Sequence, residues 1–172
     1  MILDYVLKAV FLFGIYNILA LMLFGVPESL SMTYYLFKEK SEKLKYVFPI
    51  MMTLLAFILV PCWLEISEGS MFQFTTFLAA AGIFFVGLAP AFNDSAFEMK
   101  VHSISACIAA LMALLWICLV TPYWYIILIV AAVILLLSLI TKSIKTKYIY
   151  WLEMIAFVST FISIITYYYN NL

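Results

Sequence analysis

Three side chains that could bind a metal ion or act as acid and base lie four residues apart. Asp94, Glu98 and His102 share one helix face if a helix begins near Asn93, because residues four apart lie one above another. Two carboxylates and an imidazole can ligate a divalent metal, and a carboxylate can orient a histidine as a general base. Helix capping and a hydrogen-bonded boundary histidine explain the same residues more simply, so we expect no bound metal and no cofactor.

A second ionisable residue, Glu153, follows Lys147 by six residues, which is about 9 Å along a helix. An ionisable group at such depth in an apolar stretch is costly and usually faces a partner inside a helical bundle. His102 is the expected cationic partner, although a neutral Glu153 bonded to a serine would meet the same cost. A glutamate that holds helices together or reaches the lipid interface is the structural alternative.

The elements that must position these side chains are apolar helices. Of the 172 residues 68% are hydrophobic and 10% are charged, whereas soluble domains are about half apolar and about one-quarter charged. This composition predicts an all-α, polytopic integral membrane protein. One crossing takes about 20 helical residues, which leaves room for short connections and for no separate soluble domain. We expect a single transmembrane domain over residues 1–172, an antiparallel bundle with six spans at about 2–26, 47–66, 71–91, 99–120, 122–141 and 148–167.

Prolines and polar residues mark the ends of these spans. The connection 27–46 begins with a proline and contains four lysines, and an interfacial helix is expected from Ser29 to Phe37. Residues 101–140 would form a helix about 60 Å long, twice the thickness of the bilayer core. They must therefore fold back, and we expect the break at Pro122, where proline opens a new helix. Eleven of the twelve tyrosines lie near span ends, and Tyr16 is the exception.

The lysines are distributed unevenly between the two sides of this arrangement. Loops that remain in the cytoplasm keep more lysine than loops that are translocated. Lys8 alone lies on one side, so we expect the lysine-rich connections 38–45 and 142–147 in the cytoplasm and both termini outside it. The eight lysines on the other side are Lys38, Lys40, Lys43, Lys45, Lys100, Lys142, Lys145 and Lys147.

Small residues predict which helices approach most closely. Spans 71–91 and 99–120 are rich in alanine and glycine, and small residues let helices approach in lipid, so we expect these two spans to pair tightly. Small residues are also common in membrane helices in general. Near the opposite side, Lys8 and Glu65 lie at comparable depth and could pair. The small residues four apart on one face are Gly87 and Ala91, Ala106 and Ala110, and Ala109 and Ala113.

Several classes of protein are disfavoured. The formal net charge is zero and no arginine is present, which argues against nucleic-acid binding. One histidine cannot supply a bis-histidine haem site or a multi-histidine metal site. The three cysteines form no C-x-x-C pair, and neither a nucleophile elbow nor a phosphate-binding loop is present.

We therefore expect a non-enzymatic multi-pass protein with a cavity on the cytoplasmic side that binds a lipid, a small solute or a partner subunit. Besides the bilayer, expected partners are a membrane protein or a second copy of the chain. A proton-coupled transporter using Glu153 and His102 is one alternative. A lipid-modifying enzyme with His102 as base is another, and the sequence does not choose among the three. The residues expected to line the cavity are Glu28, Ser31, Asp94, Glu98, His102 and Glu153, with Ser29 and Thr33 as further hydroxyls.

Overall fold

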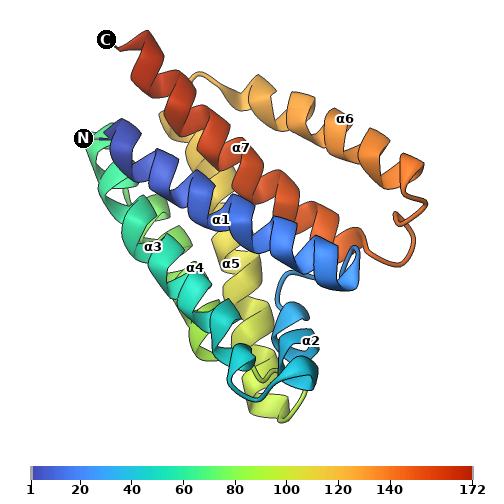
Figure 1. Cartoon of the computed structure of the whole chain (residues 1–172). Helices are drawn as coiled ribbons and strands as arrows, with labels where there is room; N and C mark the ends of the chain where they lie inside the picture. Colours follow the sequence, from blue (N-terminus) through green and yellow to red (C-terminus); the bar gives the residue numbers. More distant parts are fainter. Residues whose placement is uncertain (1, 172) are drawn as a thin grey trace.

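Apolar runs separated by glycine, proline and polar residues form the helices of this chain. The computed structural model describes residues 2–171, and over that range the chain is 79% helix with no strand. Six long helices run alternately up and down, and the short α2 lies at one end of the bundle (Figure 1). The elements are α1 (Ile2–Phe24), α2 (Thr33–Lys40), the 3-10 helix η1 (Leu44–Tyr46), α3 (Val47–Ile66), α4 (Phe74–Leu88), α5 (Ala96–Val120), α6 (Trp124–Ile140) and α7 (Tyr148–Asn170).

Four helical stretches are long and apolar enough to cross a membrane. They are α1, the continuous stretch Leu44–Ile66, α5 and α7. The other two apolar helices are shorter, because α4 has 15 residues and α6 has 17. At 1.5 Å per residue these two helices are about 22 and 26 Å long, slightly less than a hydrocarbon core of about 30 Å.

Several helix ends differ from the expected ones for local reasons. The first helix stops at Phe24 rather than near residue 26, because Gly25 adopts a left-handed conformation with φ +70°. The helix expected over 71–91 ends at Leu88, since Pro90 disfavours helical backbone at Ala89. The helix in the 27–46 connection begins at Thr33 rather than at Ser29.

The start of α5 also differs from the expected one. Ser95 caps this helix by accepting a hydrogen bond from the backbone N–H of Glu98 at 3.1 Å. Asp94 precedes the cap and lies outside the helix. The expectation that Asp94, Glu98 and His102 share one helix face is therefore corrected.

α4 and α5 approach each other closely, as the small residues predicted. A Cβ atom on Gly82 would lie 2.7 Å from the backbone nitrogen of Ala109 and 2.7 Å from the backbone oxygen of Ser105. Gly87 instead approaches α3, where its Cβ would lie 3.1 Å from the Cβ of Met52. Ala91 lies outside α4, so the expected helix-face pair of Gly87 and Ala91 does not form.

The buried side chains form two groups of unequal size. The main hydrophobic core is built from α1, α3, α4, α5 and α7, together with Leu30 and α2. The second group contains Tyr123 at the start of α6 and three α6 residues that pack against α7, which makes α6 the peripheral helix of the bundle (Figure 1). Much of the outer surface is apolar, with Phe11, Met22 and Ile140 among the exposed side chains.

Candidate functional site

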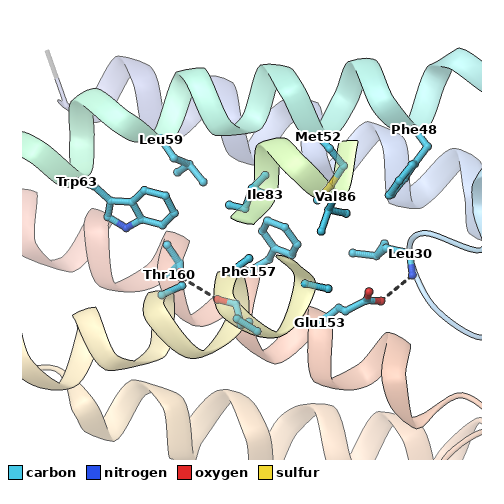
Figure 2. A pocket seen from close by; sticks show the side chains of 15 residues that line it. Leu30, Phe48, Met52, Leu59, Trp63, Ile83, Val86, Glu153, Phe157 and Thr160 are labelled. Atoms are coloured by element: carbon cyan, nitrogen blue, oxygen red, sulfur yellow. Dashed lines mark hydrogen bonds between the residues drawn. The ribbon is translucent and has the colours of Figure 1, made fainter. Parts of the chain in front are cut away.

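A cavity lies inside the bundle, between α3, α4, α5 and α7 (Figure 2). The space open to the centre of a water molecule is about 50 Å³. The cavity exists because α5 contributes only alanine side chains to its wall, and these are too short to fill the gap to the facing helices. The alanines expected to serve helix packing therefore also line this space: Ala106, Ala109, Ala110 and Ala113.

Glu153 provides the ionisable group in the wall of this cavity. Its Oε2 accepts a hydrogen bond from the backbone N–H of Leu30 at 2.7 Å, and the Leu30 side chain lines the same end of the cavity (Figure 2). Within residues 2–171 the ion pairs join Lys8 to Asp4, Lys38 to Asp94 and Lys45 to Glu42. The Glu153 carboxyl group is thus hydrogen-bonded to a backbone amide but faces no cationic side chain in the described part of the chain.

The segment from Gly25 to Thr33 positions Leu30 over the start of α7. The backbone N–H of Tyr150, in the first turn of α7, donates to the backbone oxygen of Glu28 at 3.1 Å. The first N–H groups of a helix have no partner within the helix, so this contact satisfies one of them. Together with the bond between Glu153 and Leu30, it fixes the segment at two points.

Polar side chains from α1 tie the same region together. The hydroxyl groups of Tyr16 and Thr33 are hydrogen-bonded, and both residues are buried. The Tyr150 hydroxyl donates to Oδ1 of Asn17 at 3.3 Å. The part played by Tyr16 and Tyr150 was not predicted, although the position of Tyr16 far from any span end was the available signal.

Glu28, Ser31 and Glu153 come together at this end of the cavity, but in different ways. Glu28 is exposed and contributes its backbone oxygen rather than its carboxylate. Ser31 is buried, and its hydroxyl lies 3.0 Å from that of Ser29. Glu153 is the one expected residue whose side chain lines the cavity.

His102 lies elsewhere, at the connection between α4 and α5. Its Nδ1 is 2.9 Å from the backbone oxygen of Ala89, and its ring stacks on Phe92 with centroids 4.5 Å apart. Because a carbonyl can only accept, Nδ1 carries the proton in this contact. The contact satisfies a carbonyl just beyond α4, and His102 is not among the residues that line the cavity.

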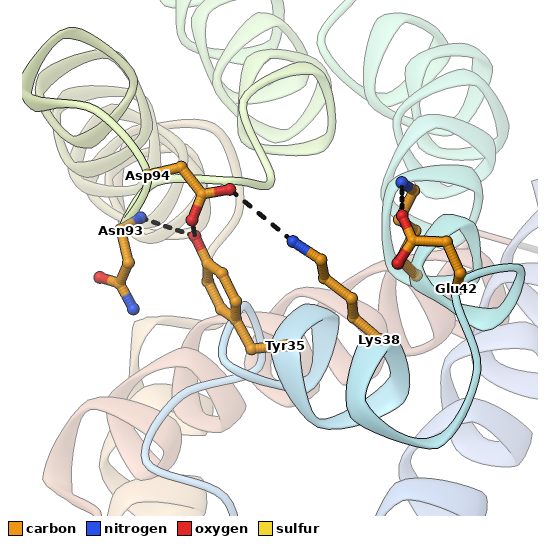
Figure 3. Close-up of polar contacts among 6 residues, drawn as sticks. Tyr35, Lys38, Glu42, Asn93 and Asp94 are labelled. Atoms are coloured by element: carbon orange, nitrogen blue, oxygen red, sulfur yellow. Dashed lines mark hydrogen bonds and ion pairs between the residues drawn. The ribbon is translucent and has the colours of Figure 1, made fainter.

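Asp94 takes part in an exposed polar cluster that joins α2 to the connection between α4 and α5 (Figure 3). Its Oδ2 lies 3.9 Å from Nζ of Lys38, and its Oδ1 accepts from the Tyr35 hydroxyl at 3.4 Å. The Tyr35 hydroxyl also accepts from the backbone N–H of Asn93 at 2.7 Å. Partial burial raises the pKa of Tyr35.

A second exposed contact lies in the same region, where Lys45 and Glu42 are hydrogen-bonded (Figure 3). This contact lowers the pKa of Glu42.

Within residues 2–171 no group of three or more histidine, cysteine, aspartate or glutamate side chains is placed to hold a metal ion. Lys8 pairs with Asp4 at 2.6 Å, and its expected partner Glu65 is exposed.

Trp63 lines the cavity at the end opposite Glu153 (Figure 2). Its side chain is 1% exposed, and its Nε1 has no hydrogen-bond partner among the described residues. The neighbouring Trp116, whose ring centroid is 6.3 Å away, donates its Nε1–H to the Ser67 hydroxyl at 2.8 Å. The cavity therefore has an acceptor at one end, apolar walls, and an unused donor at the other end.

Comparisons of the chain with protein-family models, with curated proteins and with solved structures found no match. The geometry therefore defines the site by itself. It is a mainly apolar cavity with one carboxyl group in its wall.

Proposed function

We propose that this chain is a six-span integral membrane protein in which α1, α3, α4, α5, α6 and α7 cross the bilayer. The apolar outer surface and the four long apolar helices support this arrangement. The shorter α4 and α6 are compatible with it, because a hydrophobic length a few ångströms below the bilayer thickness costs little. In this arrangement α2 lies on the side that bears eight of the nine lysines, which we place in the cytoplasm.

Cysteine accessibility tests this topology. Glu39 and Glu68 are both exposed and lie on opposite sides of the proposed bilayer. Each is replaced by cysteine in a chain whose native Cys62, Cys107 and Cys118 are alanine. With a membrane-impermeant maleimide, intact cells are expected to label E68C, and E39C only after permeabilisation. Labelling of both positions in intact cells would contradict the arrangement.

We further propose that the cavity binds a small molecule with an apolar body, anchored through its polar group at Glu153. The observation that carries this proposal is the position of a carboxyl group, without a cationic partner, in the wall of an otherwise apolar cavity. Ionisable groups buried in bilayer-spanning bundles are costly and usually have partners. A bound molecule that supplies a hydrogen-bond donor would offset this cost.

A graded series at one alanine tests whether the cavity is the binding site. Ala110→Val and Ala110→Leu fill it from α5, away from the close contact of Gly82 with Ala109. Native mass spectrometry of protein from a mild detergent is expected to detect a bound small molecule in the wild type, less in A110V and none in A110L. Glu98→Gln, which changes a carboxylate outside the cavity, is the matched control. Equal occupancy in wild type and A110L would refute the proposal.

A further inference from the structure

The ligand class of this cavity follows from the carboxyl group at one end and from the apolar walls, and the argument rests on the function proposed above. We infer that the cavity takes a linear amphiphile with a primary ammonium group. Its ammonium group lies at Glu153, and its single apolar chain runs along the alanines of α5 toward Trp63.

A cationic partner for Glu153 would come from outside the described residues. The ion pairs among residues 2–171 do not include Glu153, and the cationic partner expected from the sequence, His102, is hydrogen-bonded to the backbone oxygen of Ala89. A carboxylate with an apolar surrounding and no counter-charge is unfavourable, and a cation that binds beside it removes this cost.

The geometry at Glu153 favours an ammonium over a guanidinium group. Oε2 accepts the backbone N–H of Leu30, so a ligand group that binds both carboxylate oxygens must share Oε2 with this amide, whereas Oε1 needs no such sharing. A guanidinium group recognises a carboxylate best through two parallel hydrogen bonds and needs both oxygens. An ammonium group is a compact charge that one oxygen can bind.

The walls set the form of the remaining part of the ligand. Ala106 and Ala113 are seven residues apart on α5, and Glu153 and Thr160 are seven residues apart on α7. Each separation corresponds to about 10 Å along a helix. The four alanines on this face of α5 form a wall without hydrogen-bonding side chains, which suits an unbranched chain of this length.

The far end of the cavity is where a chain of this length would end. Trp63 and Thr160 lie there, and the Thr160 hydroxyl donates a hydrogen bond to the backbone oxygen of Ala156 at 2.8 Å (Figure 2). The Nε1–H of Trp63 is left without a partner. A chain that starts at Glu153 and runs the length of the cavity ends beside this indole, which makes Trp63 a reporter of the chain terminus.

The test compares octylamine, octanol and octanoate, three probes that share the same chain. Binding is measured by the thermal stability of the purified protein in an uncharged detergent. We expect saturable stabilisation by octylamine, weaker stabilisation by octanol and none by octanoate. Glu153→Gln should weaken octylamine binding by about tenfold or more, the value of one charged hydrogen bond, and leave octanol unchanged. Glu98→Gln should behave like wild type.

Chain length provides a second measurement. From butylamine to octylamine the affinity should rise by about fourfold per methylene, and it should stop rising once the chain reaches Trp63. An alkylamine brominated at its far end should quench the fluorescence of wild type more than that of Trp63→Phe. A continuous rise beyond octylamine, with equal quenching in both proteins, would indicate simple partition into the detergent and overturn the inference.

The outcomes separate the ligand class from the proposed function. If octylamine and octanol bind wild type equally, E153Q changes neither, and A110L abolishes both, the cavity binds ligands but the amine inference is wrong. If A110L leaves the binding of every probe unchanged, the proposed function fails as well. Because the glutamine carbonyl can still accept from Leu30, E153Q retains the contact that closes the cavity.

Discussion

The carboxylate of Glu153 accepts the backbone N–H of Leu30 at 2.7 Å, although the two residues are 123 positions apart in the chain. Leu30 lines one end of the cavity, and this bond holds its backbone to the carboxyl group of Glu153, which lines the same end. Any ligand that draws Glu153 toward itself also acts on the segment from Gly25 to Thr33.

Removal of the Glu153 carboxyl group should destabilise the protein more than its neutralisation. Glu153→Ala leaves the Leu30 N–H without an acceptor, which costs about 1–3 kcal/mol, whereas Glu153→Gln keeps a carbonyl in place. Reversible unfolding in mixed micelles measures both variants. Equal stability of E153A and E153Q would show that the bond to Leu30 contributes nothing.

Two helical glycines provide a matched pair for the contact between α4 and α5. Gly82→Ala places a Cβ atom 2.7 Å from backbone atoms of α5, and the two helices must separate. We expect a loss of about 1–3 kcal/mol from this overpacking. Gly14→Ala meets nothing within 4 Å and should stabilise α1 by about 0.5–1 kcal/mol. If Gly82→Ala and Gly14→Ala change the free energy of unfolding in the same direction, the contact between α4 and α5 at Gly82 is not as close as described.

His102 should contribute to stability and not to metal binding. His102→Ala leaves the backbone oxygen of Ala89 without its partner and removes the stacking on Phe92, for an expected cost of about 1–3 kcal/mol. Elemental analysis of the purified wild-type protein should find no stoichiometric metal. A metal that is present in wild type and lost in H102A would restore the metal-site hypothesis for Asp94, Glu98 and His102.

The two neighbouring tryptophans should respond differently to the same substitution. Both Trp63→Phe and Trp116→Phe lose buried volume, but W116F also leaves the hydroxyl of the buried Ser67 without its donor. We expect W116F to be less stable than W63F by about 1 kcal/mol, the net value of one hydrogen bond. Chemical unfolding followed by circular dichroism measures the difference, and the reverse order would contradict the assignment.

The exposed cluster around Asp94 should matter little for stability. Lys38 and Asp94 are both partly solvated, and exposed ion pairs contribute about 0–1 kcal/mol. The free energy of unfolding of the Asp94→Asn variant should therefore lie within about 1 kcal/mol of the wild-type value. A larger loss would mean that α2 is held to the connection between α4 and α5 mainly by charge.

The helices could be predicted from the sequence because their signals are local. Apolar runs predicted the six long helices, and small residues predicted the pairing of α4 with α5, which the structure makes at Gly82. The misplaced ends depend on single residues, such as the left-handed Gly25 and the proline that follows Ala89. These residues act on the backbone and leave no trace in a hydropathy pattern.

The site could be predicted only in part, because its contacts join distant segments through backbone atoms. The depth of Glu153 marked it as a candidate, but its partner is the amide of Leu30, which residue types do not reveal. His102 likewise bonds to the backbone oxygen of Ala89 rather than to a side chain. The Nε1–H of Trp63 is buried without a hydrogen-bond partner, and this follows from the packing of the helices rather than from the residue type.

The peripheral position of α6 has a consequence for how the chain is threaded. α5 and α7 run in the same direction through the bundle, so the chain must travel back along its whole length between them (Figure 1). α6 is that return path, and it contributes four buried residues of its own to the packing, three of them apolar. If the chain passed directly from α5 into α7, α7 would run in the opposite direction, and Glu153 would lie at the end of the cavity that Trp63 now occupies. This peripheral helix thus determines at which end of the cavity the carboxyl group lies.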